Sequence, residues 1–177
     1  MRDGGWMHAK DILIDAFNRI QEEVHSAVEG LDPDALNARP SPDANSISWL
    51  VWHLTRVQDD HIAEAFGLEQ VWLTQDWQKR FGLDLPRQDT GYGHSSAKVA
   101  KVQVDSGTLL TGYYDAVHEQ TLGALRSLAA KDLERVVDER WDPPVTLGVR
   151  LVSVLSDDLQ HVGQAAYLKG LVQSAAA

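Results

Sequence analysis

Hydrophobic residues recur every three or four positions in four separate stretches, which is the spacing of one face of an α-helix. The stretches cover about residues 9–29, 46–66, 105–130 and 146–172. Gly30 and Gly67 follow the first two stretches, and Asn45 or Ser46 offers a capping oxygen at the start of the second. No stretch alternates polar and apolar residues for long enough to predict a strand. We therefore predict an all-α fold, a four-helix bundle whose helices cross at shallow angles.

The stripe on each helix predicts the residues that face the core. These residues are Ile12, Ala16, Ile20, Val24 and Val28 in the first helix, Ile47, Leu50, Val51, Leu54 and Val57 in the second, and Leu109, Tyr113, Val117 and Leu125 in the third. Such stripes bury their apolar faces against one another in a bundle.

A long loop joins the second and third helices over residues 68–104. Its sequence is too irregular for one element, although a short helix is expected around residues 76–80. Loops of this length in a compact domain are usually lids or binding loops, so we expect it to shape a site. The chain of 177 residues shows no repeat or linker, and we predict one domain over residues 1–177.

Composition narrows the functional classes. The absence of cysteine excludes structural disulfides, cysteine zinc sites and a cysteine nucleophile. The net charge of -10 and the pI of about 5.0, without a basic patch, argue against nucleic acid or an anionic membrane as a partner. The first ten residues lack the apolar run of a secretory signal, and no run reaches the roughly 18 apolar residues of a membrane span. We expect a cytoplasmic protein.

Two polar residues interrupt the apolar face of the last helix. Asp157 and His161 are four positions apart, so their side chains lie one turn apart and could hold one ion. His53 lies on or beside the buried stripe of the second helix. Together they predict a metal site with three ligands and an open position for water or substrate. The alternative is an internal ion pair or hydrogen bond between Asp157 and His161, without metal.

Other candidates carry a weaker signal. Asp158 competes with Asp157, but it turns toward another part of the stripe. Asp60 and His61 could extend the face of His53, although a solvated helix end is the favoured interpretation. His94, in the sequence "GYGHSS" of the long loop, could reach the mouth of a site.

The remaining histidines and the tryptophans have simpler explanations. Surface or bundle-edge positions are expected for His8, His25 and His118. Packing accounts for Trp49, Trp52, Trp72 and Trp77 without a ligand.

The segments "NSISWLVWHLTRVQDDHIA" (45–63) and "DDLQHVGQ" (157–164) together resemble the DinB-like superfamily, which includes mycothiol-dependent transferases and maleylpyruvate isomerases. "RPSPDANS" and "TGYGHSS" extend the likeness over nearly the whole chain. The resemblance implies a four-helix bundle with a metal held by one histidine of the second helix and a His-x-x-x-His pair of the last. His53 and His161 fall on two of these positions. Asp157 takes the third, where the isomerase branch also has a carboxylate.

The resemblance implies a metal-dependent transferase that uses a low-molecular-weight thiol such as mycothiol against a small electrophile. Zinc is the first choice of divalent ion, and nickel, manganese and iron are also compatible. Gln164, one turn past His161, could orient a ligand or a water. A homodimer is plausible because members of the superfamily often pair through helix faces. The alternatives are a hydrolase with metal-activated water and a binding module without enzymatic activity.

Overall fold

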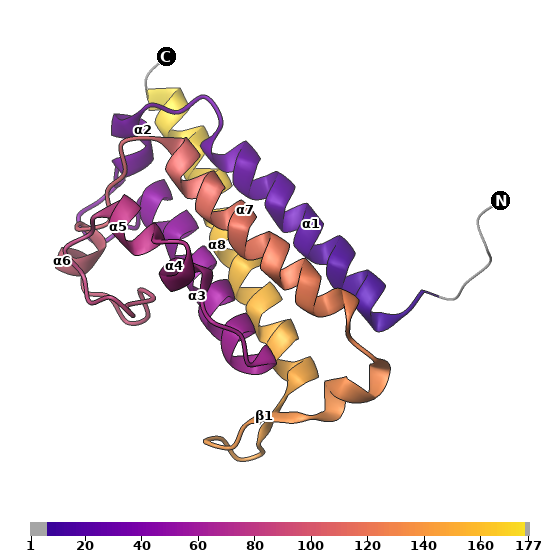
Figure 1. The fold of residues 1–177 in the computed structure, drawn as a ribbon. Coiled ribbons are helices and arrows are strands. Elements are labelled where there is room, and N and C mark those ends of the chain that lie inside the picture. The colour runs from indigo at the N-terminus through magenta and orange to yellow at the C-terminus, as the bar shows by residue number, and fades with distance from the viewer. Residues whose placement is uncertain (1–6, 176–177) are drawn as a thin grey trace.

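Four long helices lie side by side in the computed structural model, which describes residues 7–175 (Figure 1). They are α1 (Ala9–Val28), α3 (Ile47–Phe66), α7 (Gly107–Arg126) and α8 (Leu147–Ala175). Helix α1 packs against α7 and α8, and α3 packs against the same two helices, so α1 and α3 are diagonal to each other. The predicted all-α four-helix bundle is confirmed. The prediction of no signal peptide concerned the first ten residues, and residues 1–6 of these lie outside the described part of the chain.

Local sequence explains where the helices begin and end. The hydroxyl of Ser46 accepts a hydrogen bond from the Trp49 N–H and caps α3, and Gly67 ends the helix with a φ of 66°, in the left-handed region that glycine tolerates. The third helix was expected to reach residue 130, but α7 ends at Arg126, and a 3₁₀ turn, η1, follows over Ala130–Glu134.

The all-α bundle also contains a minimal strand pair that the hydrophobic pattern did not indicate. Two short strands, β1 (Val136–Asp138) and β2 (Val145–Thr146), pair antiparallel just before α8. With three and two residues they are too short to show a period of two, so the sequence pattern could not reveal them.

The core face of α1 differs from the predicted stripe at its start. Ile12 is 57% exposed, whereas Phe17 is fully buried, as are Ile20 and Val24 further along the helix. The buried face therefore runs through Phe17, a residue outside the predicted stripe.

Helix α3 is buried on nearly all sides, and its buried residues include polar ones such as His53, Arg56 and Asp59 as well as most of the predicted apolar stripe. The connection 68–104 covers the faces of α3 that the other long helices leave open. It contains α4 (Val71–Thr74), α5 (Trp77–Phe81) and α6 (Ser96–Val99), and another short helix, α2 (Pro33–Asn37), precedes α3. Trp72 and Trp77 are buried, which confirms their packing role and the expected helix near residues 76–80.

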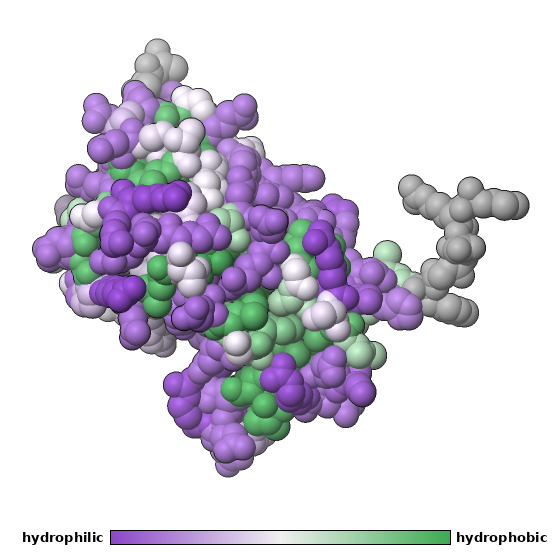
Figure 2. All heavy atoms as spheres, viewed as in Figure 1, coloured by the Kyte–Doolittle hydropathy of each residue, from purple (hydrophilic) through white to green (hydrophobic). Residues whose placement is uncertain are grey.

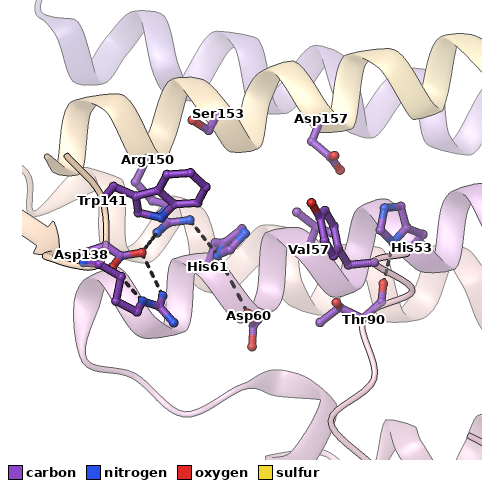
Figure 3. A pocket seen from close by; sticks show the side chains of 12 residues that line it. His53, Val57, Asp60, His61, Thr90, Asp138, Trp141, Arg150, Ser153 and Asp157 are labelled. Atoms are coloured by element: carbon purple, nitrogen blue, oxygen red, sulfur yellow. Dashed lines mark hydrogen bonds and ion pairs between the residues drawn. The ribbon is translucent and has the colours of Figure 1, made fainter. Parts of the chain in front are cut away.

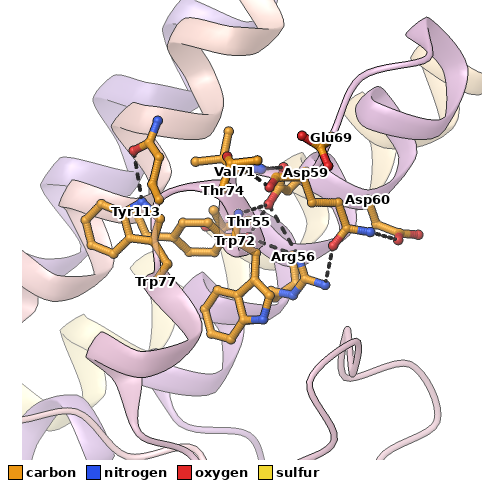
Figure 4. Close-up of polar contacts among 12 residues, drawn as sticks. Thr55, Arg56, Asp59, Asp60, Glu69, Val71, Trp72, Thr74, Trp77 and Tyr113 are labelled. Carbon is orange, nitrogen blue, oxygen red and sulfur yellow. Dashed lines mark hydrogen bonds and ion pairs between the residues drawn. The ribbon is translucent and has the colours of Figure 1, made fainter.

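A buried polar cluster fixes this connection to the bundle (Figure 4). Arg56 and Asp59 of α3 are fully buried and form an ion pair with 3.4 Å between Nη1 and Oδ2. The Asp59 carboxylate also accepts hydrogen bonds of 2.8 Å from the backbone N–H groups of Val71 and Trp72 and from the Tyr113 hydroxyl. One carboxylate thus joins α3, α4 and α7.

The surface agrees with an acidic, polar exterior. Figure 2 shows mainly hydrophilic residues over the helices on the face in view, with hydrophobic residues gathered near the end where β1 lies. Within residues 7–175, every helix is too short or too polar to cross a membrane.

Candidate metal site

The fold brings the three predicted ligands together between α3 and α8. His53, Asp157 and His161 each offer one donor atom, and these atoms all lie within 4.8 Å of one another. The two imidazole rings are 4.8 Å apart between centroids, with an interplanar angle of 74°. One divalent ion could therefore contact a nitrogen of each histidine and an oxygen of Asp157.

Hydrogen bonds at the outer nitrogens set the tautomers of both histidines. The Nδ1 of His53 lies 2.5 Å from the carbonyl oxygen of Thr90, and the Nδ1 of His161 lies 3.2 Å from Oε1 of Gln164. Since both partners can only accept, each Nδ1 carries the hydrogen and donates it. In the neutral form of each ring, Nε2 then keeps a free lone pair, which is the usual arrangement of metal-binding histidines.

The carboxylate of Asp157 has few hydrogen-bond partners for its two oxygens. Its Oδ1 lies 3.6 Å from Nε2 of His161, a distance typical of an ion pair but too long for a good hydrogen bond. Its Oδ2 is enclosed and has no hydrogen-bond partner among the described residues. A buried carboxylate oxygen without a donor is costly, and a cation in contact with it would remove that cost.

A short part of the long loop holds His53 in place. Gly91, with a φ of +92°, lies so close that a Cβ on it would be 2.7 Å from Nδ1 of His53. The Trp49 indole stacks on the His53 ring with centroids 4.5 Å apart. The Trp49 indole N–H donates to Nδ1 of His94, and Nε2 of His94 donates to Asp89 at 2.8 Å.

The two histidines differ in protonation. Burial lowers the pKa of His53, so its ring is neutral at neutral pH. Burial also acts to lower the pKa of His161, but the interaction with the Asp157 carboxylate, 3.6 Å from its Nε2, outweighs burial and raises the pKa. A metal ion would compete with a proton for Nε2 of His161, so binding would weaken as the pH falls.

A cavity of about 590 Å³ opens beside His53 and Asp157 and runs along the groove between α3 and α8 (Figure 3). Asp60 and His61 line it. His61 contacts the buried Arg150, so the interpretation of a merely solvated helix end is wrong for His61, whereas Asp60 is 38% exposed and remains compatible with it. His61 is half-buried because the segment that holds Asp138 and Trp141 packs over this end of α3.

Three other candidate residues lie outside the cavity. His94 is buried and supports Trp49, which stacks on His53, and it does not line the cavity. Gln164 contacts His161 rather than the cavity. Asp158 is fully buried away from the three-donor group, and burial raises its pKa well above the usual range.

Of the remaining histidines, His118 does not have the predicted surface or bundle-edge position. His8 and His25 are exposed as expected, but His118 is only 4% exposed, because α1 covers it and Asn18 bonds to its Nε2 at 3.1 Å. The packing role of Trp49 and Trp52 is confirmed by their burial.

Several residues of the site carried no sequence signal. Asp138, Trp141 and Arg150 line the cavity from the segment around the short strands and from the start of α8. Tyr92, from the long loop, lies at the same cavity and is 91% exposed. "TGYGHSS" pointed to the loop, but nothing marked Thr90 as the acceptor for His53, because a backbone carbonyl has no residue signature.

The fold and the site define a helical bundle with a three-donor group between two facing helices. The model of the DinB superfamily matches residues 16–165, and the chain belongs to this superfamily. It is similar to the crystal structure of a conserved protein from Enterococcus faecalis, with a TM-score of 0.89 and 32% sequence identity over 96% of this chain and 99% of that chain. No curated protein matches the sequence significantly.

Proposed function

We propose that His53, Asp157 and His161 bind a divalent metal ion, with zinc as the first candidate, and that the chain is a metal-dependent transferase. Its nucleophile would be a low-molecular-weight thiol, mycothiol-like in chemistry, and its second substrate a small electrophile. The observation that carries the proposal is the geometry of three donors within 4.8 Å of one another, with both histidine Nε2 atoms free.

The residues fit such an ion in number and kind. Two neutral imidazoles and one carboxylate suit zinc and also nickel, manganese or iron. The enclosed Oδ2 of Asp157 lacks a donor among residues 7–175, which is the defect that a cation would correct. The groups behind the ligands, Thr90 and Gln164, fix the orientation of the rings.

A bound divalent ion supplies positive charge that lowers the pKa of a thiol or a water and makes it nucleophilic at neutral pH. The residues of the chain orient the metal ligands and bind the second substrate. Trp49 and Thr90 hold the His53 ring, and the cavity walls limit water and position the second substrate. Because the chain has no cysteine, no thiol of its own competes for that position.

The first experiment measures metal content. Protein purified without chelators should contain close to one equivalent of metal, and His53→Ala and His161→Ala should lose it with the helical circular dichroism unchanged. His25→Ala is the matched control, since His25 also pairs with an aspartate, Asp115, at 2.8 Å but at the surface. Full metal content in both site variants would refute the proposed site.

Thermal unfolding adds a second measurement. Free zinc at about 100 times its Kd should stabilise the metal-free protein by about 2.7 kcal/mol. For a chain of this size that corresponds to a rise in Tm of roughly 5–10 °C. An unchanged Tm with zinc would favour the alternative in which Asp157 and His161 form an internal pair and the chain is a binding module.

The thiol is tested separately from the metal. Turnover of a small electrophile such as chlorodinitrobenzene by the zinc-loaded protein should require an added thiol and stop in His161→Ala. Hydrolysis of an activated ester without any thiol would instead support metal-activated water.

A further inference from the structure

The end of the cavity remote from His53 contains a fixed guanidinium (Figure 3). Nη2 of Arg150 donates to Oδ2 of Asp138 at 2.9 Å, and its Nη1 lies 3.2 Å from Nδ1 of His61. Only 11% of the Arg150 side chain is exposed, so its charge is largely removed from water. Two of its five N–H donors are used in these contacts and Nε is enclosed, which leaves the second N–H of each terminal nitrogen for a ligand.

His61 becomes a second donor because of this contact. Arginine can only donate, so Nδ1 of His61 accepts and its Nε2 carries the hydrogen. Burial and then the charge of Arg150 lower the pKa of His61, which keeps the ring in this neutral form. His61 and Arg150 both line the cavity.

The acidic groups nearby are already engaged. Asp138 accepts from Arg140 as well as from Arg150, and these bonds hold its pKa far below the usual range. Asp60 accepts from the Gln70 amide at 2.6 Å, and Glu64 pairs with the exposed Arg140 at 3.4 Å. The two arginines thus offset Asp138, and Asp60 adds a negative charge to the lining, so a ligand at this end would be bound through the free N–H groups of Arg150 and His61 rather than through an excess of positive charge.

The spacing along the helices sets the length of a ligand that reaches both ends. Arg150 precedes Asp157 by two turns of α8, and His61 follows His53 by two turns of α3. At about 1.5 Å per residue, the two ends are about 10 Å apart along the helix axes. Val57 and the exposed ring of Trp141 lie on the cavity wall with them and present apolar surface to the connecting part of a ligand.

We propose that Arg150 and His61 bind a carboxylate group of the substrate, about 10 Å from the group that reacts beside His53 and Asp157. The proposal rests on the proposed function, because it places the reacting end at the metal site. It makes Arg150 and His61 specificity residues for an elongated acid with an apolar middle. The planar fork of arginine matches the two oxygens of a carboxylate.

The test compares mercaptohexanoate with mercaptohexanamide, which differ only in the charge of the end remote from the thiol. Calorimetry on zinc-loaded protein should show the acid binding at least about tenfold tighter, since a hydrogen bond to a charged group contributes this much. Arg150→Gln should abolish the preference, because it weakens binding of the acid more than binding of the amide. The control Arg19→Gln removes the same charge from an exposed pair on α1 and should keep the preference.

A second variant covers the case in which Arg150→Gln does not fold because Asp138 loses a partner. His61→Phe keeps the bond between Asp138 and Arg150 but removes the imidazole donor, and it should reduce the preference several-fold. Equal binding of acid and amide by wild-type protein, or an unchanged preference in both variants, would overturn the carboxylate proposal while the metal site stands.

A separate experiment tests the carboxylate proposal if the metal-site proposal proves wrong. If the chain takes up no zinc, the proposed function fails, and hexanoate is compared with hexanamide on the metal-free protein. The guanidinium N–H resonances of Arg150, assigned by their loss in Arg150→Lys, should shift with hexanoate and not with hexanamide. The absence of that shift would overturn the carboxylate proposal as well.

Discussion

Replacing Gly91 with alanine should weaken metal binding without removing any ligand. A Cβ at this position would lie 2.7 Å from Nδ1 of His53 and 3.0 Å from Cζ3 of Trp52. The Trp52 ring is buried and has little room to move, so the loop and the imidazole must shift instead. That shift breaks the 2.5 Å bond between His53 and Thr90 and turns Nε2 away from Asp157 and His161.

Gly91→Ala should lower both the stability of the protein and its metal affinity, and each loss can be estimated separately. The backbone φ of +92° adds strain of about 1–3 kcal/mol to any residue other than glycine, and this lowers overall stability. The loss of the hydrogen bond behind a metal-binding histidine lowers metal affinity by about 10–100-fold. Only the second contribution depends on contact with His53.

Gly93 provides the matched control that separates backbone strain from the contact with His53. It lies two residues further along the same loop with a φ of +67°, but a Cβ there would meet nothing within 4 Å. Gly93→Ala should therefore lose stability to a similar degree and keep its zinc affinity. The assay is competition for zinc with a chromophoric chelator, together with urea unfolding of the metal-free proteins. Wild-type affinity in Gly91→Ala, or equal losses in both variants, would refute the reasoning.

Three further predictions concern single side chains. Gln164→Leu removes the acceptor for Nδ1 of His161, and chelator competition should show a zinc affinity lower by up to about tenfold. Asp59→Ala leaves the buried Arg56 without its carboxylate, and urea unfolding should show a loss of about 3–5 kcal/mol. Burial raises the pKa of Asp158, so the wild-type protein loses stability as the pH rises above the unfolded pKa. Asp158→Asn removes this loss, and its stability relative to wild type should increase as the pH rises above about 4.

Each of the three has a result that would count against it. An unaltered zinc affinity in Gln164→Leu would mean that the His161 ring is held by packing alone. A loss below about 1 kcal/mol in Asp59→Ala would show that water reaches Arg56. A constant stability difference for Asp158→Asn across the pH range would show that Asp158 is already ionised and paired in the folded chain.

The positions of the three candidate ligands were predictable because they depend on local periodicity. Spacing of four residues puts Asp157 and His161 on one face of a helix, and the apolar neighbours of His53 put it near the core. The predicted site required that the two helices face each other, and the packing of α3 on α8 confirms this. The side chains that support them were not predictable, since Thr90 and Gly91 act through a carbonyl and through the lack of a side chain.

The sequence by itself therefore determined the helices, their caps and three polar groups on buried faces, because each of these depends on residues a few positions apart. The tertiary structure alone decided what surrounds those groups. The connection 68–104 covers α3 and brings a carbonyl to His53, and the segment between η1 and α8 folds Asp138 against Arg150 and shields His61. These contacts join residues far apart in the chain, and their energies appear only when the packed helices exclude water and bring the groups within hydrogen-bond distance.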